Sequence, residues 1–247
     1  MKERVVLITG GASGIGLATA MKFAEECPNV AMVDVSEVNG KKAVQSLKDK
    51  NCNAIFIKCD VSKSEEVQSM INTIMDKYGR IDFAINNAGI EGTKHVIHEY
   101  PEEEWHQMIG IHLTGVWLCM KYEIPQMLKN GFGVIVNTSS TAGLLGVPTH
   151  CAYVAAKHGI LGLTKTAALE YGKQGIRVNA VCPGPIRTPM LNRIVEKYPE
   201  YEQWYVSNAV GRIADVKEMA AAIFMLCTDS ASFITGHALR VDGGLTP

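Results

Sequence analysis

The sequence predicts a doubly wound α/β fold, which is a mostly parallel sheet with helices on both faces. Short apolar runs rich in Val and Ile alternate with longer amphipathic stretches along the whole chain, a pattern typical of buried parallel strands and their crossover helices. A glycine-rich turn, residues 10–16, lies where the first strand gives way to the first helix. No linker, repeat or low-complexity tract interrupts the 247 residues, so we expect a single domain over 1–247.

The individual elements follow from the same pattern. About seven apolar runs have the length and β-branched content of buried strands: residues 4–10, 30–35, 54–61, 81–89, 133–140, 176–184 and 238–244. The helical spacing of apolar residues predicts helices over 15–26, 39–50, 64–79, 101–129 and 152–171.

Residues 188–212 break this alternation, because the segment is rich in aromatic residues and contains Pro199. An insertion late in such a sheet is a candidate lid over a substrate, or else an ordinary pair of surface helices. We expect at least one of its aromatic residues Tyr201, Trp204 and Tyr205 to face the substrate.

Composition excludes several classes of function. The chain is 47% apolar and 20% charged, with a formal net charge of -1, and its charges are too evenly mixed for nucleic-acid binding. The N-terminal apolar run is too short for a signal peptide or a membrane span, so we expect a cytoplasmic protein without membrane contact. Seven scattered cysteines without a Cys-x-x-Cys pair predict reduced thiols rather than disulfides or a zinc site.

The glycine-rich turn predicts a site for a dinucleotide. Gly10, Gly14 and Gly16 would let the backbone approach a pyrophosphate, and the helix that follows offers unpaired N–H groups at its positive end. Asp34 closes the second strand, where a carboxylate accepts hydrogen bonds from an adenosine ribose and repels a 2′-phosphate. Because no Lys or Arg occupies positions 11–13 or 35–37, the charges favour NAD over NADP.

Tyr153 and Lys157 form the candidate acid–base pair, since positions four apart lie on one helix face. An ammonium beside a phenol favours the phenolate, but lowering the phenol pKa from about 10 to 7 takes roughly 4 kcal/mol. One pair does not supply that, so we expect a second positive charge or a hydrogen-bonding chain nearby. The alternative is an ordinary surface pair.

Seven stretches of the chain carry a family resemblance: "TGGASGIG", "CDV" at 59–61, "NNAG" at 86–89, Ser140 with Tyr153 and Lys157, "PG" at 183–184, Thr188 and the terminal "VDGG". In their order and spacing they resemble the short-chain dehydrogenase/reductase family over nearly the whole chain. The resemblance implies a Rossmann-like seven-stranded sheet and a homotetramer or homodimer built on the long helices after strands four and five. It also implies that the nicotinamide is the second positive charge beside Tyr153.

The same resemblance implies a role for each matching residue. Tyr153 would be the general base in alcohol oxidation and the general acid in ketone reduction. Ser140 would orient and polarise the substrate oxygen, Ser139 would be structural, and Lys157 would hold the ribose and lower the tyrosine pKa. The implied cofactor contacts are Gly10, Ser13, Gly14, Ile15 and Gly16 at the pyrophosphate, Asp60 and Val61 at the adenine, Asn87 near the adenosine ribose, and Ile186 with Thr188 at the carboxamide.

Two positions depart from the family pattern. His112 stands where the family commonly has an asparagine that helps hold a water beside the lysine. Imidazole donates, accepts and titrates near neutrality, so His112 is a candidate member of a proton relay, or else it only packs. Pro185 removes a backbone N–H near the nicotinamide.

His95 and His98 resemble a metal pair, but we expect them to be solvated and expect no metal.

Together these features predict an NAD-dependent oxidoreductase that interconverts a secondary alcohol and a ketone on a small or medium, partly apolar substrate. The nearest alternative is an NADPH-dependent 3-oxoacyl thioester reductase of the same fold. A catalytically idle cofactor-binding module and a SAM-dependent methyltransferase are the others. The intact Ser140, Tyr153 and Lys157 argue against both of these.

Overall fold

The computed structural model describes residues 3–27 and 29–246, which form one sheet of seven parallel strands in the order β3-β2-β1-β4-β5-β6-β7. The strands are β1 (Val5–Thr9), β2 (Asn29–Asp34), β3 (Asn53–Lys58), β4 (Phe83–Asn86), β5 (Gly133–Thr138), β6 (Ile176–Pro183) and β7 (Ala238–Val241). The helices are α1 (Gly14–Phe23), α2 (Glu37–Lys48), α3 (Ser64–Tyr78), α4 (Glu102–Ile109), α5 (Gly115–Asn130), α6 (Cys151–Tyr171), α7 (Pro189–Lys197), α8 (Glu200–Tyr205) and α9 (Val216–Cys227). The predicted fold class is confirmed.

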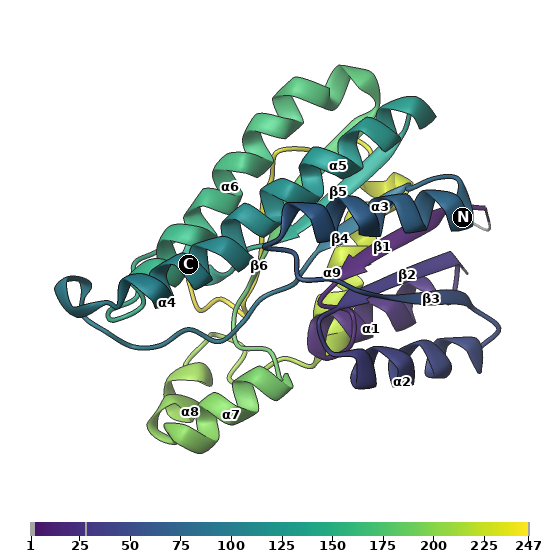
Figure 1. The fold of residues 1–247 in the computed structure, drawn as a ribbon. Helices are drawn as coiled ribbons and strands as arrows, with labels where there is room; N and C mark the ends of the chain where they lie inside the picture. The colour runs from purple at the N-terminus through teal and green to yellow at the C-terminus, as the bar shows by residue number, and fades with distance from the viewer. Residues whose placement is uncertain (1–2, 28, 247) are drawn as a thin grey trace.

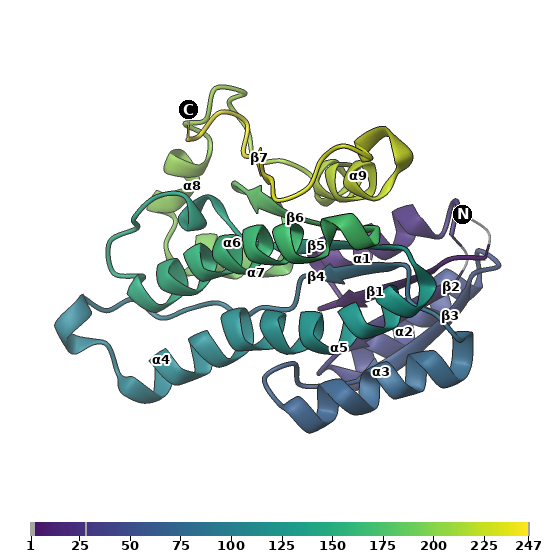
Figure 2. The same ribbon diagram turned by 90° about the horizontal axis from the view of Figure 1, so that it is seen from above.

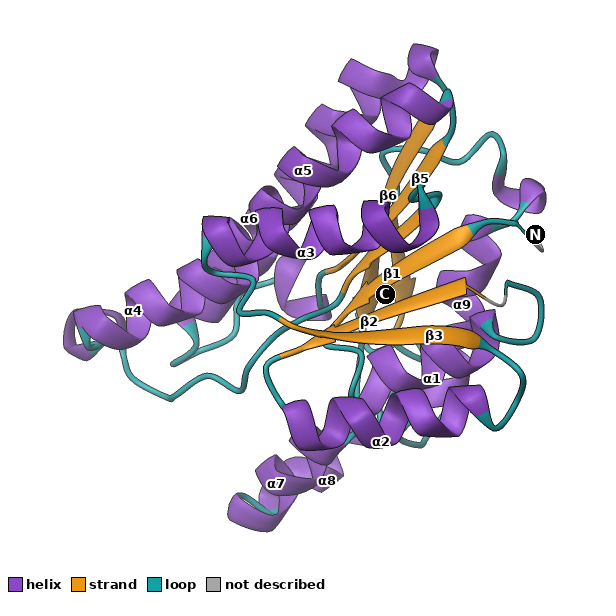
Figure 3. Cartoon of the chain, turned by 45° about the vertical axis from the view of Figure 1, so that its right-hand side comes forward, coloured by secondary structure: helices purple, strands orange, loops and turns teal. Residues whose placement is uncertain are grey.

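Both faces of the sheet are covered, which explains why its strands are apolar throughout. Along β1, Val5 and Leu7 pack into a core shared with α3, α5 and α6, while Val6 and Ile8 pack into a second core with α1, α2 and α9. Figure 3 shows these two helix layers on either side of the strands. A strand buried on both faces has no polar alternation, because successive side chains point into opposite cores.

The strand order reverses at the centre of the sheet, between β1 and β4. The chain runs outward from β1 to β3 and then returns to pair β4 with the other side of β1. In open parallel sheets, ligands bind where the strand order reverses in this way, because the loops after the two central strands diverge. The segments that follow β1, β4, β5 and β6 all meet at this edge.

The predicted helix over 101–129 is present in the structure, but its winding changes partway along. α4 and α5 are joined without a break by a π-helical turn, Gly110–Thr114, that the sequence pattern did not reveal. A π turn inserts one extra residue into the helix and shifts the faces on its two sides relative to one another. The turn carries His112 into the interior, where only 2% of its surface is exposed.

The segment 188–212 contains the two short helices α7 and α8, which stand away from the sheet in Figure 1; in Figure 2, α8 lies beyond the ends of the strands. Two backbone bonds close its base, because Arg187 N donates to Ala214 O at 2.8 Å and Ala214 N donates to Pro185 O at 3.0 Å. Leu191 and Asn208 are its buried residues. The segment is therefore an excursion that starts and ends at one point on the sheet edge and packs little against the core.

Two further expectations concern the cysteines and the membrane. Six of the seven cysteines are buried, as small apolar side chains would be, and Cys151 is partly exposed. Within residues 3–27 and 29–246, no helix is long and apolar enough to cross a bilayer.

Candidate active site

The glycine turn brings backbone, rather than side chains, to the end of β1. Gly10 has φ +62° and Gly14 has φ +52°, a region that side chains disfavour. A Cβ on Gly16 would lie 2.1 Å from the Gly10 carbonyl oxygen, so α1 packs closely on the turn only because position 16 is glycine. A Cβ on Gly14 would lie 3.4 Å from the Thr188 methyl group. The glycine turn therefore presents exposed backbone at the end of β1, and Thr188 lies opposite it.

The N-terminus of α1 lies at this turn. Ser13 occupies the N-cap in an extended conformation, its side chain makes no capping bond, and the first turn carries no acidic residue. The N–H groups of the first turn and the positive end of the helix dipole are thus available to an anion. Ile15 lies in this first turn. These features fit the pyrophosphate of a dinucleotide.

Asp34 lies beside the turn at the end of β2. Its Oδ2 accepts from Ala12 N at 3.1 Å, and its Oδ1 accepts from Ser36 N at 2.9 Å. A carboxylate oxygen can accept two hydrogen bonds, so each oxygen retains a lone pair for a ribose hydroxyl. The carboxylate thereby fixes the turn and also presents a negative charge at its rim.

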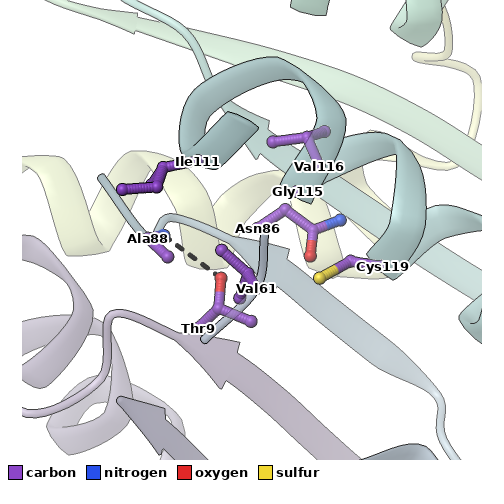
Figure 4. Close-up of a pocket in the computed structure, with 8 residues that line it drawn as sticks. All are labelled: Thr9, Val61, Asn86, Ala88, Ile111, Gly115, Val116 and Cys119. Carbon is purple, nitrogen blue, oxygen red and sulfur yellow. Dashed lines mark hydrogen bonds between the residues drawn. The ribbon is translucent and has the colours of Figure 1, made fainter. Parts of the chain in front are cut away.

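Asp60 and Val61 follow β3, and their side chains differ in direction. Asp60 accepts from Ser62 N at 3.0 Å and Ser62 Oγ at 2.7 Å, while Val61 is buried. Figure 4 shows Val61 turned inward beside Thr9 and Asn86, in a pocket too small to hold a water molecule. Only the backbone of Val61 therefore remains for contact with an adenine.

Asn87 holds the end of β4 against the glycine turn. Its Nδ2 donates to Thr9 O at 3.2 Å and Gly10 O at 3.3 Å, and its Oδ1 accepts from Thr138 Oγ1 at 3.4 Å. Thr9 Oγ1 in turn accepts from the backbone N–H groups of Asn87 and Ala88. The amide of Asn87 is thus used to join three loops of the site.

Ser140, Tyr153 and Lys157 come together where β5 meets α6. Ser140 lies just after β5 and Tyr153 lies in the first turn of α6, and the Ser140 hydroxyl is close enough to the phenol to lower its pKa. The Lys157 ammonium lies 5.4 Å from the centre of the Tyr153 ring. The side chains that the sequence singled out therefore form one cluster.

Lys157 is held from β5 by a contact that the sequence did not predict. Its Nζ donates to the Thr138 carbonyl at 2.8 Å, and its own carbonyl accepts from Ser139 Oγ at 2.9 Å, which gives Ser139 a structural role. A Cβ on Gly143 would lie 2.3 Å from Ser139 Oγ, so this close packing needs glycine there. Burial lowers the pKa of Lys157 to about 7. A backbone carbonyl has no sequence signal, which is why Thr138 was missed.

The pKa of Tyr153 differs from the expectation of a phenol made acidic by its lysine. Burial raises it above the ordinary 10, and the nearby Ser140 hydroxyl lowers it by a smaller amount. Removing a phenol from water disfavours the phenolate, and here this effect outweighs the protein's own stabilising groups.

His112 packs against Tyr153 with ring centres 5.3 Å apart and nearly perpendicular planes. Its Nε2 lies 3.0 Å from Ile90 O and 3.1 Å from Ile90 N, while its buried Nδ1 has no partner in the described protein. Burial, followed by repulsion from Lys157, lowers the pKa of His112 to about 3. The imidazole is therefore neutral near pH 7, and a part for His112 in a proton relay stays a prediction.

Ile186 and Thr188 stand at the base of the 188–212 segment. Ile186 pairs with Ala214 in an isolated parallel bridge, and Thr188 Oγ1 caps α7 by accepting from Leu191 N at 3.1 Å. The carbonyl of Pro185 accepts from Ala214 N, so this proline closes the base of the segment without needing an N–H of its own. Both candidate carboxamide contacts thus lie on a fixed part of the chain, across from Gly14.

The histidine pair is dispersed. His95 Nε2 lies 3.4 Å from Glu104 and His98 Nε2 lies 3.7 Å from Glu99. In the part of the chain that the structure describes, no three His, Cys, Asp or Glu side chains are grouped as metal ligands.

Curated relatives cover the whole chain. A family model described as enoyl-(acyl carrier protein) reductase matches residues 10–246. A 2,5-dichloro-2,5-cyclohexadiene-1,4-diol dehydrogenase of Sphingobium indicum is 41% identical over 100% of this chain and 98% of its own length. A cyclohexanol dehydrogenase of an Acinetobacter species is 38% identical over 99% of this chain and 95% of its own.

Solved structures agree in fold. Levodione reductase superposes with a TM-score of 0.94 at 36% identity, covering 99% of this chain and 98% of its own. An NAD⁺-bound xylitol dehydrogenase gives 0.94 at 34% identity, covering 98% and 99%. An actinorhodin polyketide ketoreductase variant with NADPH gives 0.93 at 33% identity, covering 98% and 97%. The likeness thus extends to proteins that hold either nicotinamide cofactor.

Proposed function

Because the chain belongs to the short-chain dehydrogenase/reductase family, we propose that it is an NAD-dependent oxidoreductase that interconverts a secondary alcohol and a ketone. The proposal rests chiefly on one observation: Ser140, Tyr153 and Lys157 are gathered at the sheet edge next to a glycine turn that can hold a pyrophosphate. An idle cofactor-binding module would have no need of a phenol set between a serine hydroxyl and a buried lysine.

The proposed mechanism assigns one task to each side chain. In oxidation, Ser140 holds the substrate hydroxyl and the Tyr153 oxygen takes its proton; in reduction, Tyr153 returns the proton to the carbonyl oxygen. Lys157 holds the ribose of the cofactor and offers its positive charge to the phenolate. Nicotinamide, when bound, supplies the hydride chemistry and, in its oxidised form, a positive ring. Since burial raises the pKa of Tyr153, both charges are needed to make it a base near neutral pH.

The cofactor is proposed to be NAD. The turn after β1 and the N-terminus of α1 would hold the pyrophosphate, through Gly10, Ser13, Gly14, Ile15 and Gly16. Asp34 would bind the adenosine ribose and repel a 2′-phosphate. Asp60 and the backbone of Val61 would border the adenine, with Asn87 near the ribose, and Ile186 and Thr188 would hold the carboxamide.

The proposed substrate is a cyclic secondary alcohol or its ketone. Two of the relatives are named for six-membered-ring alcohols, cyclohexanol and a dichlorocyclohexadienediol. The segment 188–212 adds Tyr201, Trp204 and Tyr205, and the first two rings each contact that of Tyr205. Flat apolar rings of this kind favour a compact, partly apolar substrate.

One alternative has an observation in its favour. The description of the family model and the NADPH-containing ketoreductase both fit reduction of an acyl thioester with NADPH. The two functions differ in cofactor and in substrate length. Rates with NADH and NADPH, on cyclic ketones and on 3-oxoacyl thioesters, distinguish them directly.

The deciding experiment is a screen of alcohols and ketones followed by the Tyr153→Phe variant. We expect turnover of the best substrate to fall by a factor of about 10²–10⁴, the usual contribution of a general acid–base group. NADH binding, followed by its fluorescence, should remain within a few-fold. Full activity in Tyr153→Phe would overturn the mechanism, and no turnover of any substrate by the parent would favour the idle module.

Assembly and location complete the proposal. We propose a homodimer or homotetramer formed through α5 and α6, because apolar side chains such as Leu169 and Trp117 are exposed on these helices. The buried cysteines suit a reducing compartment, in keeping with a cytoplasmic protein.

A further inference from the structure

A short segment between β4 and α4, residues 91–95, is anchored to the body of the protein. His95 N donates to Thr149 O at 3.0 Å, and His95 forms an isolated parallel bridge with His150, just before α6. Glu104 on α4 accepts from Thr93 Oγ1 and lies 3.4 Å from His95 Nε2. The residues on both sides of Lys94 are thus fixed to α4 and α6, so the base of the Lys94 side chain is held in place.

From this base, the Lys94 side chain crosses to α7 and α8. Its ammonium lies 3.1 Å from the centre of the Tyr198 ring and 3.8 Å from the centre of the Tyr201 ring. It also donates a hydrogen bond to the Tyr201 hydroxyl at 2.7 Å, across 107 residues of sequence. A cation over two aromatic faces that also donates to one of their hydroxyls is well satisfied and partly shielded from water. A second link, Arg193 to Glu91 at 3.6 Å, is more exposed and weaker.

The rings that Lys94 holds continue along α8 to Tyr205. Tyr198 contacts Tyr201 at 5.7 Å between centres, and Tyr201 contacts Tyr205 at 6.1 Å. Tyr205 is half-buried. Burial raises the pKa of Tyr205 to about 12, with further contributions in the same direction from Tyr201, Tyr153 and Glu91. Tyr205 is therefore joined to Lys94 through the Tyr201 ring and hydroxyl.

We propose that Lys94 is a positioning residue: by clamping Tyr198 and Tyr201, it latches α7 and α8 over the site and holds Tyr205 against the substrate. The segment needs such a latch because its two ends are pinned at one point, by the bonds between residues 185–187 and Ala214, and little of it is buried. Elements with few buried contacts open readily. The effect on turnover rests on the proposed function, whereas the latch itself does not.

Amide hydrogen exchange of the full-length protein tests the latch without any substrate. A contact of this class changes an opening equilibrium by about two- to thirty-fold. In Lys94→Met, which keeps the length of the side chain and removes its charge, we expect amides of residues 189–205 to exchange about ten-fold faster. Tyr198→Leu should have a similar effect, and the double variant should be little faster than either single one, because both remove the same contact. Lys94→Arg should restore protection, since guanidinium also binds aromatic faces.

Lys197 provides the matched control. Its ammonium lies 5.2 Å from the centre of the same Tyr198 ring, but it belongs to α7 itself and links nothing to the body. Lys197→Met should leave exchange of residues 189–205 unchanged. Equal exchange in Lys94→Met and the parent would overturn the proposal, and so would a loss of protection in Lys197→Met as large as in Lys94→Met.

The positioning role has its own readout in the KM and kcat of the best alcohol. Lys94→Met should raise KM about ten-fold and leave kcat unchanged or higher, because a loosened lid weakens substrate binding and does not slow product release. A faster-exchanging lid with an unchanged KM would overturn the positioning role. A protein that turns over no alcohol would refute the proposed function, while the exchange data would still decide the latch.

Discussion

The Asp34 carboxylate both fixes the glycine turn and places a negative charge beside it. Each of its carboxylate oxygens accepts one backbone N–H, from Ala12 and from Ser36, which fixes the side chain at the rim of the glycine turn. The remaining lone pairs suit ribose hydroxyl groups, and the charge opposes a phosphate at the same place. The cofactor preference should therefore depend on the charge more than on the shape of this side chain.

Asp34→Asn tests this dependence, because it keeps the shape and removes the charge. We expect the ratio of kcat/KM with NADP to kcat/KM with NAD to rise at least ten-fold, mostly through a lower KM for NADP. Asp76→Asn, at an exposed position on α3, is the matched control and should leave the ratio unchanged. A ratio that does not move in Asp34→Asn would remove the basis for proposing NAD.

His112 packs against Tyr153, and its lowered pKa favours an effect on Tyr153 through this contact over one through its own titration. Its pKa of about 3 keeps the imidazole neutral throughout the working range, and its ring shields the phenol from water. Asparagine is smaller than histidine, so His112→Asn should let water reach the Tyr153 phenol. Water there weakens the desolvation that raises the pKa of Tyr153. The acidic limb of the pH profile of alcohol oxidation should then move to lower pH by about half a unit, with activity within about ten-fold of the parent.

His158→Asn, at an exposed position on α6, should leave the profile in place. If the two variants give the same profile as the parent, His112 has no part in proton transfer, either directly or through Tyr153.

At the scale of elements, the strands could be predicted because β-branched runs buried on both faces leave a continuous apolar signal. The π turn Gly110–Thr114 could not be predicted from the sequence. One extra residue in a helix changes the contacts on either side of it but leaves the local composition unchanged. Its effect is nonetheless large, since it sets His112 beside Tyr153.

The same contrast holds within the candidate site. The glycines, Asp34 and Ser140 could be predicted because they stand at the carboxyl ends of strands, and Tyr153 with Lys157 because positions four apart share one face of a helix. The contacts of Lys157 with the Thr138 carbonyl and of Lys94 with Tyr201 join segments by way of the fold. Nothing in the local sequence records such pairs.

α5 is fastened to the sheet by a buried carboxyl group, and this gives a prediction about stability. Glu123 is fully buried and accepts from Asn86 Nδ2 at 3.2 Å, while Glu123 Oε1 and Asn86 Oδ1 have no partner among the described residues. Burial raises the pKa of Glu123 to about 8, above its ordinary 4.5. Between these values the folded protein retains a proton that the unfolded chain has lost, so the stabilisation is complete below about pH 4.5 and is lost as the pH rises through 8.

Glutamine does not titrate, so the free energy of unfolding of Glu123→Gln should fall less between pH 5 and pH 8 than that of the parent. We expect the two decreases to differ by about 2–4 kcal/mol. Urea unfolding at a fixed protein concentration measures the difference. Glu170→Gln, at an exposed position on α6, controls for the change of charge. Parallel pH dependence in Glu123→Gln and the parent would mean that Glu123 is ionised in the fold.

At the scale of the whole molecule, the helix layer formed by α4, α5 and α6 has an unusual outer face. Leu169 is 86% exposed and Trp117 is 45% exposed, while Trp105 on α4 is also exposed. Single exposed apolar residues are ordinary, but several on one layer of helices suit a contact between copies of the chain. This is the face on which the proposed assembly depends.

Leu169→Lys places a charge in that contact without touching the core or the site. We expect it to lower the mass measured by sedimentation or light scattering toward that of one chain, because an unpaired charge in an apolar interface costs several kcal/mol of association free energy. Val38→Lys makes the same change at a position 66% exposed on α2, on the opposite helix layer, and should leave the mass as it is. A Leu169→Lys protein that keeps the parent's mass would show that the copies, if they associate, do so through another surface.

Because the site of each chain is built from its own residues, NADH binding should survive dissociation. Loss of NADH binding would mean that contact between copies also orders the carboxyl edge of the sheet.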